Sequence, residues 1–455
     1  MSDTSGATHK LLLATSLVLI NSLFAGETLT YDPAGSGGGS TPGTAPRGIS
    51  IIGVTYSNAI APSDTSLSDN VVTILSTDTS DVKYVFGGYS DTGDVENNTV
   101  NISGGTIQYN IYGGHSNKGS ANSNTVNISG GIISGNVYGG YIYRGLGSAT
   151  NNTVTISGTP TIDTIIVGGH KDSGGGDVTT DNTLNIKTSK LNVKNIANFE
   201  FINFYLSGDA GKSSSILNLT NGSNTDISAS KLSIGLMDNG NTPDLKVGSK
   251  IILIGKSSDS YTGIPNTVAD DSLYKFVISK DSNNIIATLT NEVLVYNPQS
   301  TAFEGVTHIS NTTPGTITMN SHNIYNTIAP NSASPSDNVI SIYSTNNDVE
   351  YIYGGYGDGK SATTSNNVVN LYGGTIKFDV YGGYAAGKDN TANSNTINIS
   401  GGTIERDIFG GFGISGTATN NTINISGNPI FSDTTIYGGY AASGEAITGN
   451  TLNIK

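Results

Sequence analysis

Two aspartates occupy the same place in neighbouring copies of a repeated motif. Asp379 and Asp407 each stand two residues before an aromatic residue and a Gly-Gly pair. If the copies stack in register, the two carboxylates lie on adjacent rungs about 5 Å apart. That separation suits the carboxylate pair of a retaining glycosidase, or a cation site. The alternative, which we favour, is a structural ladder at a solvated turn, because Asn110 and Asn136 hold the same place in earlier copies and Arg406 lies beside Asp407.

The histidines do not form a metal-binding pattern. His115 and His170 follow Gly-Gly pairs but lie two repeats apart, and Tyr141 holds the matching place between them. His308 and His322 lie in an irregular stretch. We expect packing or surface roles for all four, and no GxSxG motif or other nucleophile context accompanies them.

Acidic loops at 91–94 and 172–177 invite comparison with calcium sites. They match neither the glycine-rich repeat of calcium-binding β-rolls nor the EF-hand spacing. We interpret them as polar turns. The sequence therefore predicts no catalytic residue, no metal site and no cofactor.

An aromatic residue recurs on each side of the Gly-Gly pairs. Because side chains alternate along a strand, we expect one series to face inward and the other outward. An outward series would form a row on which glycans or a protein partner stack. The alternative is that the rings stack only on one another and stabilise the fold. The series before the Gly-Gly pairs comprises Phe86, Tyr112, Tyr138, Tyr353, Tyr381, Phe409 and Tyr437. The series after them, the candidate ligand-facing row, comprises Tyr89, Tyr141, Tyr356, Tyr384, Phe412 and Tyr440.

All these residues belong to a repeat of 26–30 residues. Each copy opens with an asparagine followed by alternating polar and apolar residues, as in the stretch 98–102. The openings fall into two sets offset by about 268 residues, which predicts two copies of one long module. The openings are Asn70, Asn98, Asn124, Asn152 and Asn182 in the first set, and Asn338, Asn367, Asn395, Asn421 and Asn450 in the second.

The alternation predicts short strands separated by turns rich in Asn, Ser and Gly. One repeat cannot bury an apolar face by itself, but stacked repeats can. We therefore expect an all-β, right-handed parallel β-helix of roughly 16 coils, each of ~26 residues and ~4.8 Å thick. Val100 would lie over Val126 and Ile102 over Ile128, with Asn or Thr ladders outside. A β-propeller is disfavoured, because its blades need about 40 residues.

The chain divides by composition. The apolar run 11–20, followed by Ser22 and Ala25, is typical of a secretory signal peptide. For the stretch between the repeat blocks we expect irregular coils of the same solenoid, with a helical or compact insert as the alternative. The predicted divisions are a signal peptide at 1–26, a Gly/Ser/Pro-rich linker at 27–50, the first repeat block at 51–187, an irregular β segment at 188–292 and a second block, incomplete at its C-terminus, at 293–455.

Charge and cysteine content exclude several functions. The chain has 21 basic and 35 acidic residues and a net charge of −14, so no basic stripe is available for nucleic acid. The same acidity disfavours anionic ligands. The absence of cysteine excludes disulfides, thiolate zinc sites and cysteine nucleophiles.

The motif NTVNISGGTI with IYGGY, together with NFEFINFYLS, ILNLT and LKVGSKIILI in the intervening segment, resembles autotransporter (type V secretion) passenger domains over most of residues 28–455. The resemblance implies a long β-helix displayed at the outer membrane by a translocator barrel downstream of Lys455. Many members of that family are adhesins or act in aggregation. No active-site motif is implied.

The sequence thus predicts an exported protein, at the cell surface or extracellular, with an adhesive or structural role. We expect it to bind glycans or proteins of host or neighbouring cells through repeated shallow contacts, so that affinity arises from multivalency. The alternative is a β-helix carbohydrate-active enzyme, a polysaccharide lyase or hydrolase that uses the carboxylates of Asp379 and Asp407.

Overall fold

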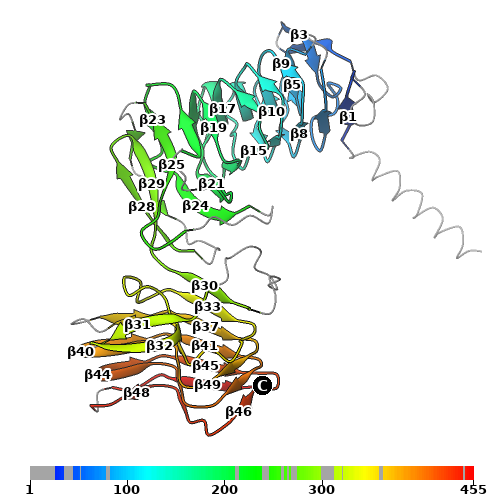
Figure 1. The fold of residues 1–455 in the computed structure, drawn as a ribbon. Helices are drawn as coiled ribbons and strands as arrows, with labels where there is room; N and C mark the ends of the chain where they lie inside the picture. Colours follow the sequence, from blue (N-terminus) through cyan, green and yellow to red (C-terminus); the bar gives the residue numbers. More distant parts are fainter. Residues whose placement is uncertain are drawn as a thin grey trace, which may run out of the picture.

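The chain folds as a parallel β-solenoid. The computed structural model describes residues 26–34, 45–51, 53–77, 82–210, 215–237, 245–257, 261–263, 266–267, 274–298, 312–319, 321–357, 362–443 and 446–455. Within them the chain is all-β, without a helix, and winds through about twelve turns, which confirms the predicted fold class (Figure 1). No helix in this part of the chain is long and apolar enough to span a membrane.

In the first stack of turns, the strands pair in parallel with their copies one turn along, apart from the antiparallel pair β2–β3. The main sheet runs in the order β1 (Thr28–Tyr31), β4 (Val71–Ile74), β8 (Thr99–Ile102), β12 (Thr125–Ile128), β15 (Thr153–Ser157), β18 (Thr183–Lys187), β21 (Phe201–Leu206), β24 (Lys231–Leu236) and β27 (Asn266–Thr267). A second sheet runs β2 (Arg47–Ile51), β3 (Val54–Ile60), β5 (Tyr84–Phe86), β10 (Ile111–Ser116), β14 (Val137–Arg144), β17 (Ile165–Ser173) and β20 (Asn195–Ala197), with β6 (Tyr89–Ser90) also on β10. A narrow sheet holds β9 (Thr106–Ile107), β13 (Ile132–Ile133) and β16 (Thr161–Ile162).

The register is the predicted one. Val100 pairs with Val126 and Ile102 with Ile128, and the next turn continues both columns. These side chains are buried in the central core, because the alternation directs every second residue inward.

The second stack repeats this arrangement. Its main sheet runs β30 (Val293–Tyr296), β33 (Val339–Ile342), β37 (Val368–Leu371), β41 (Thr396–Ile399), β45 (Thr422–Ile425) and β49 (Thr451–Ile454). Beside it run β31 (Gly315–Met319), β32 (His322–Ile328), β34 (Tyr351–Tyr353), β39 (Val380–Tyr381), β43 (Ile408–Phe409) and β47 (Ile436–Tyr437). Next come β35 (Tyr356–Gly357), β40 (Tyr384–Asn393), β44 (Phe412–Thr419) and β48 (Tyr440–Ala441), with β36 (Thr363–Ser365) on β40, and then β38 (Thr375–Ile376), β42 (Thr403–Ile404) and β46 (Ile430–Phe431).

Each stack begins with the same device. A single strand, β1 or β30, opens the main sheet, and an antiparallel hairpin, β2–β3 or β31–β32, opens the neighbouring sheet.

The predicted linker at 27–50 is wrong at both ends, since Thr28–Tyr31 and Arg47–Ile51 are strands; its residues 35–44 lie outside the described part. The predicted signal peptide, apart from Gly26, also lies outside it.

The segment between the stacks partly continues the solenoid. β21 and β24 extend the main sheet, and β19 (Leu191–Val193) and β22 (Leu217–Leu219) start another. That second sheet then turns antiparallel through β25 (Lys250–Lys256), β29 (Asn284–Leu289) and β28 (Phe276–Asp281), and the chain runs on from β29 to β30, where the second stack starts (Figure 1). The predicted number of roughly 16 coils is too high, because the residues in the antiparallel hairpins add no turns to the solenoid.

Candidate functional site

The two aromatic series lie together on the outside of the central core. In the second stack, Tyr353 and Tyr381 stack at 4.8 Å between ring centroids, and Tyr384 and Phe412 stack at 4.9 Å. The series also meet edge to face, since the rings of Tyr381 and Tyr384 lie 5.0 Å apart at 88°. The prediction that one series faces inward and the other outward is therefore wrong. The chain bends at the Gly-Gly pair, so the side chains before and after it lie on the same side of the solenoid.

A hairpin covers one end of each aromatic cluster. In the second stack the apolar cluster includes Ile317 and Met319 of the β31–β32 hairpin. Tyr356, next to the hairpin, is 6% exposed, whereas Tyr384, Phe412 and Tyr440 farther along are partly exposed. The candidate row is therefore buried beside the hairpin and partly exposed beyond it.

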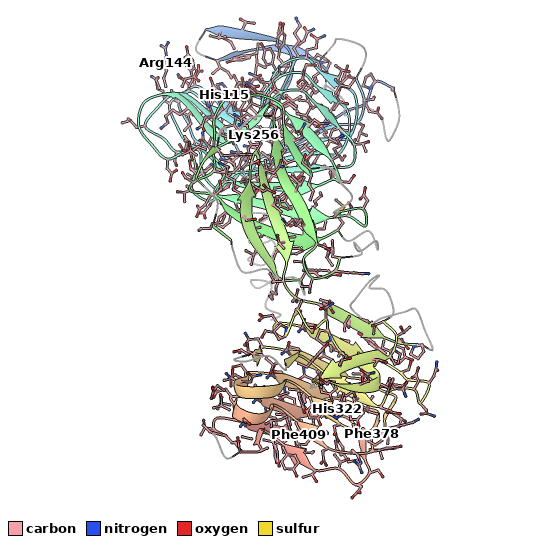
Figure 2. All side chains as sticks on the ribbon, turned by 60° about the vertical axis from the view of Figure 1, so that its left-hand side comes forward. His115, Arg144, Lys256, His322, Phe378 and Phe409 are labelled. Carbon is pink, nitrogen blue, oxygen red and sulfur yellow. The ribbon has the colours of Figure 1, made fainter. Side chains whose placement is uncertain are left out.

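The corresponding row in the first stack contains histidines. His115, labelled in Figure 2, is 1% exposed. Its ring lies between others, with Tyr141 stacked at 4.8 Å and Tyr112 edge-on at 4.9 Å. Neither ring nitrogen has a hydrogen-bond partner. Burial lowers the pKa of His115 to about 4, so the ring is neutral at pH 7. This is the packing role expected from the sequence.

Asp172 joins two members of that row at the surface. The hydroxyl of Tyr141 donates to its Oδ2 at 2.7 Å, and His170 Nε2 lies 2.9 Å from its Oδ1. Burial and this hydrogen bond to a carboxylate both raise the pKa of Tyr141. The side chain of Tyr141 is thus fixed with its hydroxyl toward solvent.

The carboxylate pair forms part of a backbone ladder. Asp379 Oδ1 accepts from the Asp407 amide at 3.2 Å, and Asp407 Oδ1 accepts from the Thr435 amide at 2.9 Å. In the first stack, Asn110 Oδ1 accepts from the Asn136 amide in the same way, at 2.9 Å. The geometry matches the structural ladder that the sequence suggested as the alternative to a catalytic pair.

An arginine and a tyrosine lie near the two carboxylates. Arg406, which precedes Asp407 in the sequence, has its guanidinium over the Phe378 ring at 5.4 Å. The Tyr381 hydroxyl donates to the other oxygen of Asp379 at 2.9 Å.

A second, inner ladder is formed by the asparagines that open each repeat. Asn124 Oδ1 accepts both the backbone amide and the side-chain amide of Asn98, at 3.1 and 3.0 Å. Its own Nδ2 donates to Val95 O and to Asn152 Oδ1. Sequence analysis placed Asn ladders only outside, and missed this one because a buried asparagine is recognisable only when its partners are known.

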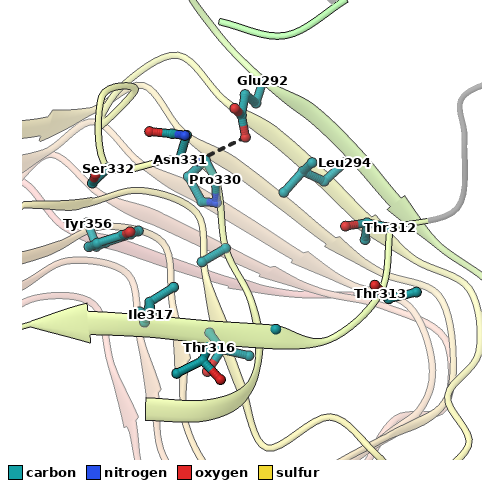
Figure 3. Close-up of a pocket in the computed structure, with 13 residues that line it drawn as sticks. Glu292, Leu294, Thr312, Thr313, Thr316, Ile317, Pro330, Asn331, Ser332 and Tyr356 are labelled. Carbon is teal, nitrogen blue, oxygen red and sulfur yellow. Dashed lines mark hydrogen bonds between the residues drawn. The ribbon is translucent and has the colours of Figure 1, made fainter. Parts of the chain in front are cut away.

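A pocket of about 380 Å³ lies where the second module begins, beside the hairpin β31–β32 (Figure 3). Its walls come from β30, the hairpin, the turn at 329–332 and Tyr356. Glu292 lines it and accepts the backbone amide of Asn331 at 2.9 Å through Oε2. The sequence analysis did not single out these residues. An alignment of the two modules would have revealed that Gly315 replaces Arg47 at this place.

The remaining candidates form no constellation. Among the described residues, no three His, Asp or Glu side chains gather as metal ligands. In the loop 172–177, Asp177 accepts from the Thr180 hydroxyl and from the amides of Thr179 and Thr180; these bonds lower its pKa, as in an ordinary polar turn. His322 is exposed on β32, and His308 lies outside the described residues. No protein-family model, curated protein or solved structure matches the chain significantly.

Proposed function

We propose that the protein is an exported, autotransporter-like passenger with an adhesive or structural role at the cell surface. The observation that carries this proposal is the partly exposed row of Tyr384, Phe412 and Tyr440, whose rings follow one another at 4.9 and 5.1 Å. Such a row offers the same contact once per turn. The polar ladders of the outer faces repeat in the same way, as between Asn398 and Asn370.

The packing of the rings defines how a partner would bind. Neighbouring rings cover each other's faces, at interplanar angles of 5° and 14° along the row of Tyr384, Phe412 and Tyr440. A glycan or protein would therefore meet ring edges and tyrosine hydroxyls rather than flat ring faces. Each contact is weak, so useful affinity requires many of them at once.

We do not propose catalysis at Asp379 and Asp407. Both carboxylates accept a hydrogen bond from a backbone amide of the next turn. In the first stack, the side-chain oxygen of Asn110 accepts the equivalent bond.

Adhesion is tested with beads coated with the whole chain and applied to a cultured epithelial monolayer. We expect adherence above that of albumin-coated beads, and a loss of about tenfold or more when Tyr384, Phe412 and Tyr440 are all changed to Ser. Asn398→Ala, on another face, is the control and should adhere normally. Adherence equal to that of albumin would contradict the proposal.

Export is tested in a Gram-negative host. We expect the chain in the periplasmic or extracellular fraction, and its retention in the cytoplasm after deletion of residues 1–26. Cytoplasmic retention of the intact chain would contradict export.

A further inference from the structure

The hairpins that open the two modules, β2–β3 and β31–β32, can be compared residue by residue. Arg47 and Gly315 are both the first residue of the hairpin strand that opens a stack, and each is followed by the same shift in strand register. The residues around them correspond as well. The corresponding pairs are Glu27 and Glu292, Ala61 and Ala329, Pro62 and Pro330, and Tyr89 and Tyr356.

In the first module, the Arg47 side chain lies across this site. Its Nη2 donates to the carbonyl oxygen of Ala61 at 3.2 Å and to that of Pro62. Burial raises the pKa of Tyr89, and the positive charge of the nearby Arg47 opposes that rise. The guanidinium is thus held by two carbonyl groups, with the Tyr89 phenol in its neighbourhood.

In the second module, the arginine is replaced by Gly315, and the pocket of about 380 Å³ is found there. A Cβ atom placed on Gly315 meets no other atom within 4 Å. The residues that correspond to the partners of Arg47, namely Ala329, Pro330 and Tyr356, all line the pocket. Glu292 lines it too (Figure 3).

We propose that this pocket binds the guanidinium group of an arginyl side chain from a partner polypeptide. The ligand would take the place that Arg47 fills within the first module. A guanidinium fits better than an ammonium, because it presents several donors in one plane to acceptors that are spread apart, and because it packs against an aromatic ring. The carboxylate of Glu292 and the net charge of −14 favour a cation. This inference depends on the comparison of the modules and not on the proposed adhesive role.

The test is calorimetric titration of the whole chain with N-acetyl-arginine methylamide. The lysine analogue and the neutral citrulline analogue are the comparison ligands. We expect one arginine site per chain and at least about tenfold weaker binding of both analogues. Absence of arginine binding, or equal binding of the citrulline analogue, would overturn the proposal.

Two substitutions exchange the modules' roles. Gly315→Arg should fill the pocket and abolish binding, whereas Ser134→Arg, which adds the same charge at an exposed position of the first stack, should leave binding unchanged. Arg47→Gly should open a second pocket and raise the number of sites from one to two. Unchanged binding by Gly315→Arg, or a single site in folded Arg47→Gly, would refute the proposal; if Arg47→Gly does not fold, Gly315→Arg alone decides.

Discussion

The side chain of each opening asparagine connects neighbouring turns of the solenoid. Asn98, Asn124 and Asn152 are buried, and each amide both donates to and accepts from its neighbours along the axis. The outer ladder is different, because Asn127 donates to Asn101 Oδ1 at 2.9 Å while both side chains remain partly exposed. The same residue type therefore has two energetic roles, decided by burial.

Asn124→Ala should lower the free energy of unfolding by about 3 kcal/mol, because the buried backbone amide of Asn98 loses its acceptor. The side-chain bonds of residue 124 with Asn98 Nδ2, Val95 O and Asn152 Oδ1 are lost as well. Asn127→Ala, the matched control, should cost about 1 kcal/mol or less, since water replaces its single bond. Urea denaturation measures both. Equal losses would show that the inner ladder does not stabilise the fold.

His115 should make stability depend on pH. Its pKa is about 4 in the fold, while an unfolded histidine titrates near ~6.5. The unfolded chain therefore takes up a proton first as the pH falls, and the contribution of neutral His115 is complete above pH ~6.5 and declines towards pH ~4, by up to about 3 kcal/mol. Tyr56, Tyr112 and Tyr141 surround the ring.

The measurement compares urea midpoints at pH 7.5 and 4.5. His115→Phe should lose less stability on acidification than the unaltered chain, whereas His322→Phe, at an exposed position, should behave like the unaltered chain. An unchanged pH dependence in His115→Phe would show that this buried ring is not responsible.

The double substitution Asp379→Asn, Asp407→Asn should be tolerated, with a change in unfolding free energy within about 1 kcal/mol. Asn110 shows that an amide oxygen accepts the same backbone bond. Circular dichroism and urea denaturation check stability, and a reducing-sugar assay on plant and bacterial polysaccharides checks activity. Polysaccharide cleavage by the unaltered chain that disappears in the variant would contradict the structural role and favour an enzyme.

At the scale of elements, the Gly-Gly corner is the feature that repeats most faithfully. A Cβ on Gly113 would lie 2.4 Å from the carbonyl oxygen of Gly139 in the next turn, and one on Gly114 would lie 2.5 Å from Asn124 Nδ2. Glycine is required there because the next turn approaches closely. The hairpins β2–β3 and β31–β32 were not predicted, because their strands alternate like the others and nothing local marks them as antiparallel.

Gly113→Ala should destabilise the chain by several kcal/mol, since the clashing atom is backbone of the adjacent turn. Gly235→Ala is the control, because its Cβ would meet Tyr205 at an ordinary 3.5 Å. Thermal unfolding followed by circular dichroism compares the two variants. A larger loss for Gly235→Ala would contradict the close approach of turns at the corner.

At the scale of the whole molecule, period and register were predictable, since a repeat of 26–30 residues with alternating strands has few solutions other than stacking. The pairing of Ile102 with Ile128 follows directly from that period. The direction of the aromatic series was not predictable, because it depends on how sharply the chain bends at each Gly-Gly corner. The pocket beside Gly315 lies where the second module has glycine in place of the arginine of the first.

The register of successive turns is tested most directly by an engineered disulfide in a chain that contains no cysteine. Asn101 and Asn127 are partners on adjacent strands and face outward. The variant with cysteine at both positions should form an intramolecular disulfide on mild oxidation, detected by mass spectrometry. Cysteines at Asn101 and Thr125, two residues out of register, should remain reduced. Failure of the first pair to close, or equal closure of both pairs, would contradict the stacked solenoid.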